Sequence, residues 1–140
     1  MNQYQAMNAR HQAEVDQFPF MFAFSQKQFE EGMARLGLDP SDTDKILSIG
    51  GGGYIRKTDR DALHEMMDRH AAETQAAIDA DETGEGFVRD MFVYELYNHE
   101  FSYTGDVTDT LEALGLTAEE VWADPKLRHG LREAKKIVLR

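Results

Sequence analysis

Four consecutive glycines at positions 50–53 limit what this chain can fold into more than any other feature of its sequence. Glycine destabilises a helix interior, so we expect no helix to continue through this run. A short apolar segment, residues 46–49, precedes the glycines, and residues 54–56 follow them as Tyr, Ile and Arg. We therefore expect two short strands, or one bulged strand, with the glycines at a turn where neighbouring backbone passes close.

Four phenylalanines alternate with other residues ahead of this region. Side chains of a strand point alternately to its two faces, so the pattern places all four rings on one face. This predicts a strand whose phenylalanine face lies in the core, and Pro19 confines that strand to an edge or makes it begin there. The four residues are Phe18, Phe20, Phe22 and Phe24. Phe101 and Tyr103 alternate in the same way.

Helix signals account for most of the remaining chain. Residues 2–16 are polar and weakly periodic, which predicts a helix with little to bury. Apolar residues at positions 87, 88, 91, 92 and 96 predict a helix that ends near residue 97. Asp124 followed by Pro125 predicts the start of the last helix, because proline is tolerated at the first helical position. Three further helix starts are predicted by capping pairs, at Ser25–Gln28, Thr58–Asp61 and Thr117–Glu120.

Together these elements predict an α+β fold, a mainly helical single domain over residues 1–140 with a small antiparallel sheet. Residues 1–17 are expected to form a loosely packed N-terminal helix. The chain has no cysteine, which excludes disulfides and thiolate metal sites and fits a reducing cytoplasm. Because no apolar run is long enough to span a bilayer or resembles a signal peptide, we expect a cytoplasmic protein that does not contact membranes.

The charge is distributed unevenly along the chain, whose net charge is −11. Residues 58–124 hold eighteen Asp and Glu against three Arg, whereas residues 125–140 hold six Lys and Arg against one Glu. A surface this acidic repels nucleic acid, so we expect no direct binding to it. It attracts basic protein surfaces and speeds their encounter. The alternative is that the acidity only keeps a small protein soluble.

The most concentrated acidic stretch, residues 79–86, is predicted to be a loop between two helices. We expect its carboxylates to attract a basic nucleic-acid-binding protein of the host, and two tyrosines of the following helix to anchor the contact. Carboxylates spread over a rigid surface would then imitate the phosphates of DNA. Residues 125–140 could instead pair with the acidic body of a second copy, giving a homo-oligomer. The predicted partner-binding residues are Asp79, Asp81, Glu82, Glu85, Tyr94 and Tyr97.

The glycine run also suggests an alternative function, the binding of a small anion or phosphate. Glycine amides, a helix N-terminus and the cations Arg56 and Lys57 could together hold an anion. The P-loop pattern needs a glycine immediately before the lysine, and Arg56 occupies that position, so nucleotide hydrolysis is not expected. The predicted anion-binding residues are Gly50, Gly51, Gly52, Gly53, Arg56 and Lys57.

Two pairs of side chains at helical spacing raise the question of a metal site. His64 with Asp68, and Glu95 with His99, would resemble a carboxylate–histidine site if their helices faced each other. The patterns of zinc proteases and di-iron proteins are not met, so we predict no metal and no cofactor. No nucleophile motif is present either, and the expected function is not enzymatic. The histidines predicted to lie on the surface without partners are His11 and His129.

Three stretches carry a resemblance to a known family: "FPFMFAFSQKQFEEGMARLGL", "SIGGGGYIRKTDRDALHEMMDRH" and "YELYNHEFSYTGDVTDTLEALGL". Over roughly residues 18–135 the chain resembles an uncharacterised family of small acidic proteins associated with bacterial mobile elements and phages. The resemblance implies a context and no activity. Some anti-CRISPR and anti-restriction proteins from such elements are acidic and occupy nucleic-acid channels. By that analogy we expect an inhibitor or adaptor whose acidic face, residues 58–124, docks on a partner such as a CRISPR effector.

Overall fold

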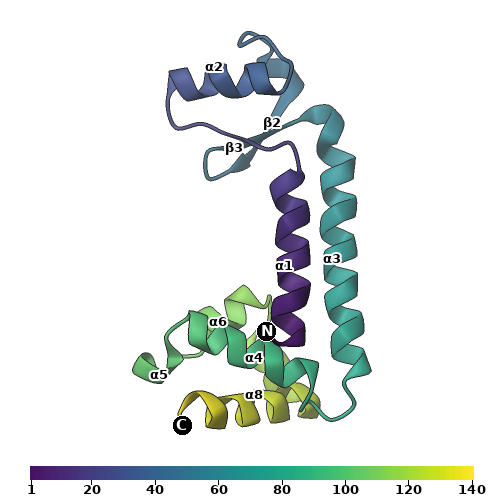
Figure 1. The fold of residues 1–140 in the computed structure, drawn as a ribbon, viewed down its shortest axis with the longest axis vertical. Coiled ribbons are helices and arrows are strands. Elements are labelled where there is room, and N and C mark those ends of the chain that lie inside the picture. Colours follow the sequence, from purple (N-terminus) through teal and green to yellow (C-terminus); the bar gives the residue numbers. More distant parts are fainter. The chain divides into compact units, whose positions relative to one another are not determined.

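The structure is a computed structural model that describes all 140 residues, and it confirms an α+β fold that is mainly helical (Figure 1). It contains eight α-helices and one three-stranded antiparallel sheet. The contacts divide the chain into two compact units, each with its own core. Unit 1 comprises residues 1–12 and 72–140, and unit 2 comprises residues 13–71. The single domain and the loose packing of residues 1–17 stay predictions.

Two helices contribute residues to both units, α1 (Gln3–Gln17) and α3 (Arg60–Ala80). The other helices of unit 1 are α4 (Phe87–Asn98), α5 (Phe101–Thr104), α6 (Thr108–Ala113), α7 (Ala118–Ala123) and α8 (Pro125–Val138). The other elements of unit 2 are β1 (Met21–Phe22), α2 (Gln26–Arg35), β2 (Ile46–Gly50), β3 (Gly53–Arg56) and the 3₁₀ turns Thr43–Lys45 and Lys57–Asp59. No helix combines the length and the apolar character needed to cross a membrane.

The core of unit 1 is built around α4. All five apolar positions predicted for this helix are buried, together with Glu95. α8 packs against α4 at Gly130, where an added Cβ would lie 2.5 Å from Cγ1 of Val88, so only glycine permits this close approach. The other helices of unit 1 complete a continuous core. Their buried residues are Tyr4, Met7, Phe101, Leu111, Val121, Leu127, Ala134 and Val138.

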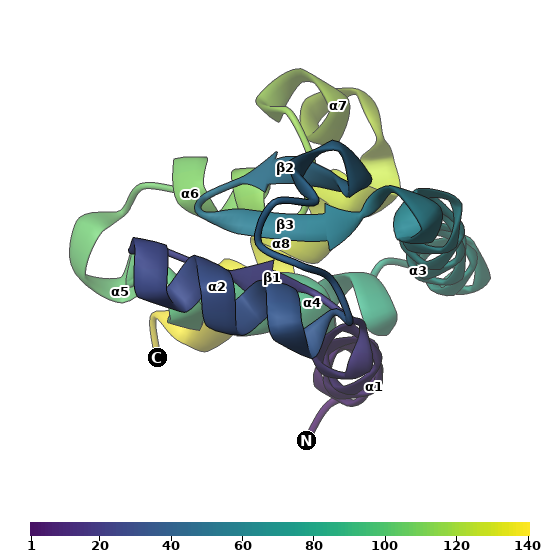
Figure 2. The same ribbon diagram turned by 90° about the horizontal axis from the view of Figure 1, so that it is seen from above.

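The sheet of unit 2 has the strand order β1-β3-β2, and both pairings are antiparallel. Gly50 pairs with Gly53 across the turn, and a bulge lies between Ser48 and Gly50. This confirms the two short strands predicted on either side of the glycine run. α2 lies alongside the sheet (Figure 2) and contributes Met33 to a small core, which also includes Leu36, the residue that follows α2. The buried residues of that core are Met21, Met33 and Leu36.

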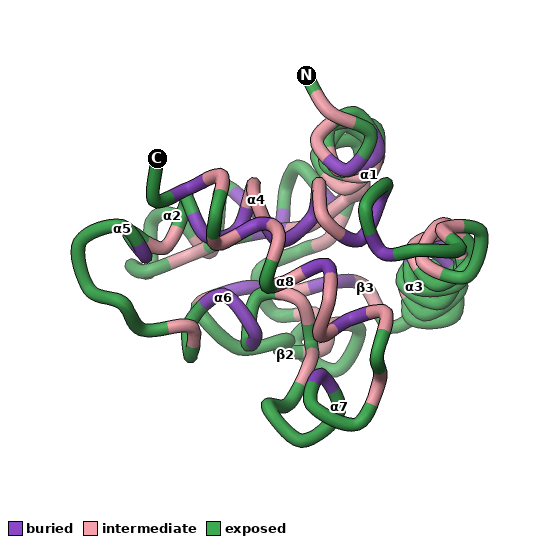
Figure 3. The backbone as a smooth tube through the Cα atoms, turned by 90° about the horizontal axis from the view of Figure 1, so that it is seen from below, coloured by how far each residue is buried: buried purple, intermediate pink, exposed green.

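The phenylalanine face that was predicted to lie in the core is exposed instead. β1 is only two residues long, and it is Met21 that is buried against α2. Phe22 and Phe24 are 54% and 77% exposed, while Phe18 and Phe20 are half-buried. By contrast, buried stretches recur along α4 of unit 1 (Figure 3). The prediction of the buried face was wrong because α2 covers the opposite side of β1, and alternation alone does not say which side is covered.

The capping pairs predict two of three helix starts correctly. The hydroxyls of Ser25 and Thr117 each accept the backbone N–H three residues later, at 3.2 and 3.1 Å. The third prediction was wrong, because Thr58 lies inside a 3₁₀ turn and α3 begins at Arg60. The last helix begins at Pro125, as expected.

Phe101 and Tyr103 do not form a strand. They lie in the short helix α5, where Phe101 is buried and Tyr103 is 88% exposed. Residues two apart on a helix point to different sides, so this spacing separates the two rings. The strand pattern was too short to exclude a helical turn.

Candidate functional site

The acidic loop predicted at residues 79–86 begins at residue 81, because α3 continues to Ala80, and Asp81 organises it. Asp81 accepts backbone N–H groups from four residues, Thr83, Gly84, Gly86 and Val88, at 2.9–3.3 Å. Burial opposes the ionisation of Asp81, but these N–H groups outweigh it and hold the pKa of the carboxyl below its usual value. Asp81 is therefore committed to the internal structure of the loop.

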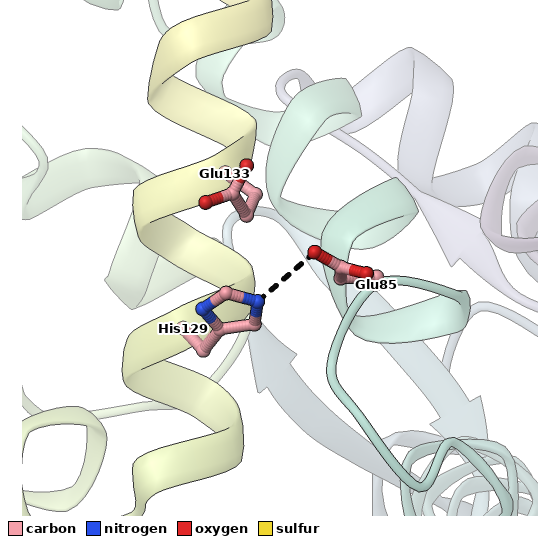
Figure 4. Close-up of side chains that lie close together, drawn as sticks. All are labelled: Glu85, His129 and Glu133. Carbon is pink, nitrogen blue, oxygen red and sulfur yellow. Dashed lines mark hydrogen bonds and ion pairs between the residues drawn. The ribbon is translucent and has the colours of Figure 1, made fainter.

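The backbone of the loop also lies close against the start of α8. A Cβ added to Gly84, whose φ is +90°, would lie 2.5 Å from the carbonyl oxygen of Lys126. The ammonium of Lys126 donates to the carbonyl of Ile78 at 2.6 Å. Next to this contact, His129 is hydrogen-bonded to Glu85 at 3.1 Å (Figure 4). The prediction that His129 lacks a partner was therefore wrong.

Glu85, His129 and Glu133 form the tightest cluster of possible metal ligands, with three ligand atoms within 4.8 Å of one another (Figure 4). Carboxylate and imidazole are ligands for divalent transition metals. The hydrogen bond between Glu85 and His129, together with the 2.8 Å ion pair between Lys136 and Glu133, already explains the arrangement. The cluster serves to hold the acidic loop on α8.

The other predicted partner-binding residues differ in their environments. Asp79 and Glu82 are exposed, and Asp79 accepts a hydrogen bond from Gln75 at 2.9 Å. Tyr94 is half-buried, with its ring 5.6 Å from that of Tyr4. Tyr97 is 56% exposed. Three of the six predicted residues, Asp79, Glu82 and Tyr97, are thus accessible to a partner, and the only internal contact at stake is the exposed hydrogen bond between Gln75 and Asp79.

The structure does not gather the predicted anion-binding residues into one site. Gly50, Gly51 and Gly52 have positive φ and form the turn between β2 and β3. Arg56 lies at the far end of β3, where its guanidinium donates to Asp59 at 2.7 Å and to the carbonyl of Leu36 at 3.3 Å. Lys57 is exposed beside it in the 3₁₀ turn. Glycines in a hairpin turn supply the geometry that the turn needs, and anion binding there stays a prediction.

The two histidine–carboxylate pairs lie in different units. His64 and Asp68 are exposed on α3 in unit 2. In unit 1, Glu95 is buried and accepts the hydroxyl of Tyr4 at 2.9 Å. Its second oxygen is hydrogen-bonded to His99 at 3.2 Å. Burial raises the pKa of Tyr4 above its usual value, so this hydroxyl keeps its proton and donates to Glu95.

α1 and α3 are joined in unit 2 by an ion-pair cluster that the sequence analysis did not predict. Glu14 of α1 pairs with Arg69 of α3 and is hydrogen-bonded to His70 at 3.2 Å. The hydrogen bonds from Arg69, and then from His70, lower the pKa of Glu14 to about 2. Glu14 therefore stays ionised at neutral pH and holds the two helices together.

Unit 1 contains the same cluster with the roles of the helices exchanged. Glu73 of α3 contacts Arg10 at 2.6 Å and His11 at 3.0 Å on α1, and these contacts, His11 first, lower its pKa to about 2. The prediction that His11 lacks a partner was therefore wrong. The missed signal is a repeated pattern, Arg-His-x-x-Glu, at residues 10–14 and 69–73. Two antiparallel helices with this pattern satisfy each other's charges.

An acidic surface with exposed tyrosines extends over residues 97–112, from the end of α4 to α6. We call it the acidic segment. Tyr97 and Tyr103 are 56% and 88% exposed. No Lys or Arg occurs between Arg89 and Lys126. The carboxylates of the segment are all exposed, and none forms an ion pair; they are Glu100, Asp106, Asp109 and Glu112.

Comparison with known proteins gives one match. A family model described as a family of unknown function, DUF7659, matches residues 3–137. No curated protein and no solved structure matches the chain. The function must therefore be argued from the residues themselves.

Proposed function

Since the chain belongs to the DUF7659 family of unknown function, we propose that it is a non-enzymatic adaptor or inhibitor that binds a basic protein through the acidic segment. The observation that carries this proposal is a run of exposed carboxylates without cationic partners in the chain. Such carboxylates keep their full charge for an external partner. Those of Glu14 and Glu73 are already neutralised by arginine.

The exposed tyrosines of the acidic segment also support this proposal. Charge complementarity speeds association and selects partners, but buried aromatic residues carry most of the affinity of an interface. Tyr103 is 88% exposed on a four-residue helix flanked by acidic residues. A partner could bury the exposed ring of Tyr103 without any rearrangement of the core of unit 1.

Asp79 and Glu82 are two further exposed acids of unit 1, outside the acidic segment. They are the predicted partner-binding acids that remain exposed without an ion pair, and they would add long-range attraction. Their contribution should appear in the association rate and its dependence on salt more than in the lifetime of the complex.

The partner in this proposal is a basic nucleic-acid-handling protein of the host, such as a CRISPR effector. A channel for nucleic acid is lined with Lys and Arg, so carboxylates on a rigid helical surface complement it as phosphates do. The resemblance to proteins of mobile elements, some of which inhibit host defences, supports this choice by analogy.

The test is capture of partners from a host lysate by the tagged protein at low and high salt, followed by mass spectrometry. We expect a basic nucleic-acid-binding protein that is retained at low salt and lost at high salt, because screening shortens the range of charge attraction. The double variant Asp109→Lys/Glu112→Lys should lose that protein, and Tyr103→Ala should shorten the lifetime of the complex.

A matched control distinguishes the effect of the acidic segment on binding from the effect of the net charge of the protein. Glu30→Lys/Glu31→Lys makes the same charge change at exposed positions of α2 in unit 2. It should retain the partner at low salt. If both double variants lose it equally, net charge and not the acidic segment is responsible. If capture does not depend on salt, the proposal fails.

A further inference from the structure

A pocket of about 270 Å³ lies in unit 1 between α6, α7 and α8. Its apolar lining comes from all three helices and includes Leu111, Val121 and Leu131. Trp122 borders the pocket and is 71% exposed, so its indole lies at the mouth. The volume is close to the lower limit of pockets that hold small molecules.

Three cations border the same pocket, Arg128, Arg132 and Lys135. They are four and three residues apart on α8, which places them on one face of the helix. The guanidinium of Arg128 lies 5.3 Å from the centre of the Trp122 ring and donates to the Trp122 carbonyl at 2.8 Å. The ammonium of Lys135 lies 5.7 Å from the ring of Phe101.

None of these three cations forms an ion pair with a carboxylate of the chain. The attraction of cations to the C-terminal end of a helix accounts for Lys135, but Arg128 lies in the first turns of α8, where a cation is not favoured. Arg128 is held by Trp122, so it is Arg132 whose charge at the pocket has no partner within the chain.

We propose that this pocket binds a small amphiphilic anion, a carboxylate with a short aliphatic or aromatic body. The body would fill the apolar space against Leu131 and Trp122, and the carboxylate would pair with Arg132 and its neighbours. Arg132 is exposed, so its guanidinium is free to turn toward a ligand. This inference goes beyond the proposed function, because its ligand is a small molecule and its residues lie outside the acidic segment except for those of α6.

Trp122 allows a direct test, because it is the only tryptophan of the chain. Sodium octanoate is titrated into the full-length protein while the emission of Trp122 is recorded. We expect a saturable change, and a much weaker one with octanol, which has the same apolar body without the charge. Arg132→Gln should weaken octanoate binding about tenfold, as expected for loss of a charged hydrogen bond.

Arg140→Gln is the matched control, since it removes one exposed positive charge from the same unit outside the pocket. It should bind octanoate as the parent protein does. The proposal is overturned if octanoate leaves the emission unchanged, if octanol binds equally well, or if the two Arg variants behave alike. It is also overturned if the emission depends on protein concentration without ligand and light scattering shows a dimer, because a second copy would then fill the pocket.

Discussion

The two units of this protein differ in how much apolar surface they bury. Unit 1 has a continuous core of thirteen buried residues drawn from α1 and α4–α8. The core cluster of unit 2 has three, Met21, Met33 and Leu36, supported by half-buried neighbours. A small core contributes little stability, so unit 2 depends more on its hairpin, on glycine turns and on the ion pairs between α1 and α3.

The comparison shows that the number of aromatic residues in a unit does not predict the size of its buried core. Unit 2 has the row of phenylalanines, yet Phe22 and Phe24 remain exposed. In unit 1, α4 is covered by other elements on several sides, so all five of its predicted apolar positions are buried. Burial follows from the number of elements that surround a segment, and β1 has only one helix packed against it.

The largest expected effect is that of a cavity in the core of unit 1. Phe92 is fully buried, and Phe92→Ala should lower the free energy of unfolding by about 3–5 kcal/mol. Met33→Ala creates a cavity in unit 2 and should cost less, because the side chains of a smaller core can close around it. Urea unfolding followed by circular dichroism measures both. Equal losses would contradict the contrast between the two cores.

A smaller effect is expected at two buried helical glycines. In Gly130→Ala the new Cβ would meet the backbone oxygen of Gly84 at 2.8 Å as well as Val88, and we expect a loss of about 1–3 kcal/mol. In Gly32→Ala it would meet Cγ and Sδ of the buried Met21, with Sδ at 2.8 Å, and this unbranched side chain can adapt more easily than a backbone oxygen. Gly130→Ala should therefore be the more destabilising variant in thermal unfolding. The reverse order would show that unit 2 is packed as rigidly as unit 1.

The ion-pair clusters predict how stability depends on pH in each unit. Glu14 and Glu73 have pKa values of about 2 in the folded protein, below the usual value of 4.5. A carboxyl group whose pKa is lowered by folding stabilises the folded protein at pH values above the pKa of the unfolded chain. This stabilisation is lost as the pH falls from about 4.5 to about 2. Glu14→Gln and Glu73→Gln should each flatten the loss of stability over this range, measured as unfolding midpoints against pH.

Both carboxylates are solvent-exposed, so each effect should be modest and should shrink in high salt. The pKa of each carboxyl is lowered to about 2, so we expect Glu14→Gln and Glu73→Gln to have effects of similar size. Glu31→Gln is the control, since Glu31 is exposed without an ion pair. If Glu14→Gln leaves the pH dependence of the unfolding midpoint unchanged, the ion pairs of Glu14 do not contribute to stability.

The smallest effect is expected at the exposed phenylalanines. Phe24→Ser should change the free energy of unfolding by less than about 0.5 kcal/mol, as substitutions at exposed positions do. Phe29→Ser should lower it more, because the ring of Phe29 packs against that of Tyr54, with 5.7 Å between the ring centres. A large loss in Phe24→Ser would show that the phenylalanine face is covered in solution. The measurement is the urea midpoint of each variant.

The sequence predicted the fold class and several local features, because these depend on neighbours in the chain. The strands beside the glycine run, the caps at Ser25 and Thr117 and the apolar face of α4 were all predicted correctly. The candidate site was predicted less well. Asp81 and Glu85 were assigned to a partner, but both make internal contacts in the structure, and the pocket beside Trp122 was not predicted.

What the sequence determined by itself is the set of local choices: where helices begin, where the backbone must turn, and how charge is distributed along the chain. These follow from side chains within a few residues of one another. Only the tertiary structure decided which face of β1 is buried, which carboxylates are neutralised and which remain free. It also placed Trp122 and Arg132 at one pocket. These outcomes depend on how helices and strands pack against one another, which a periodic pattern does not specify.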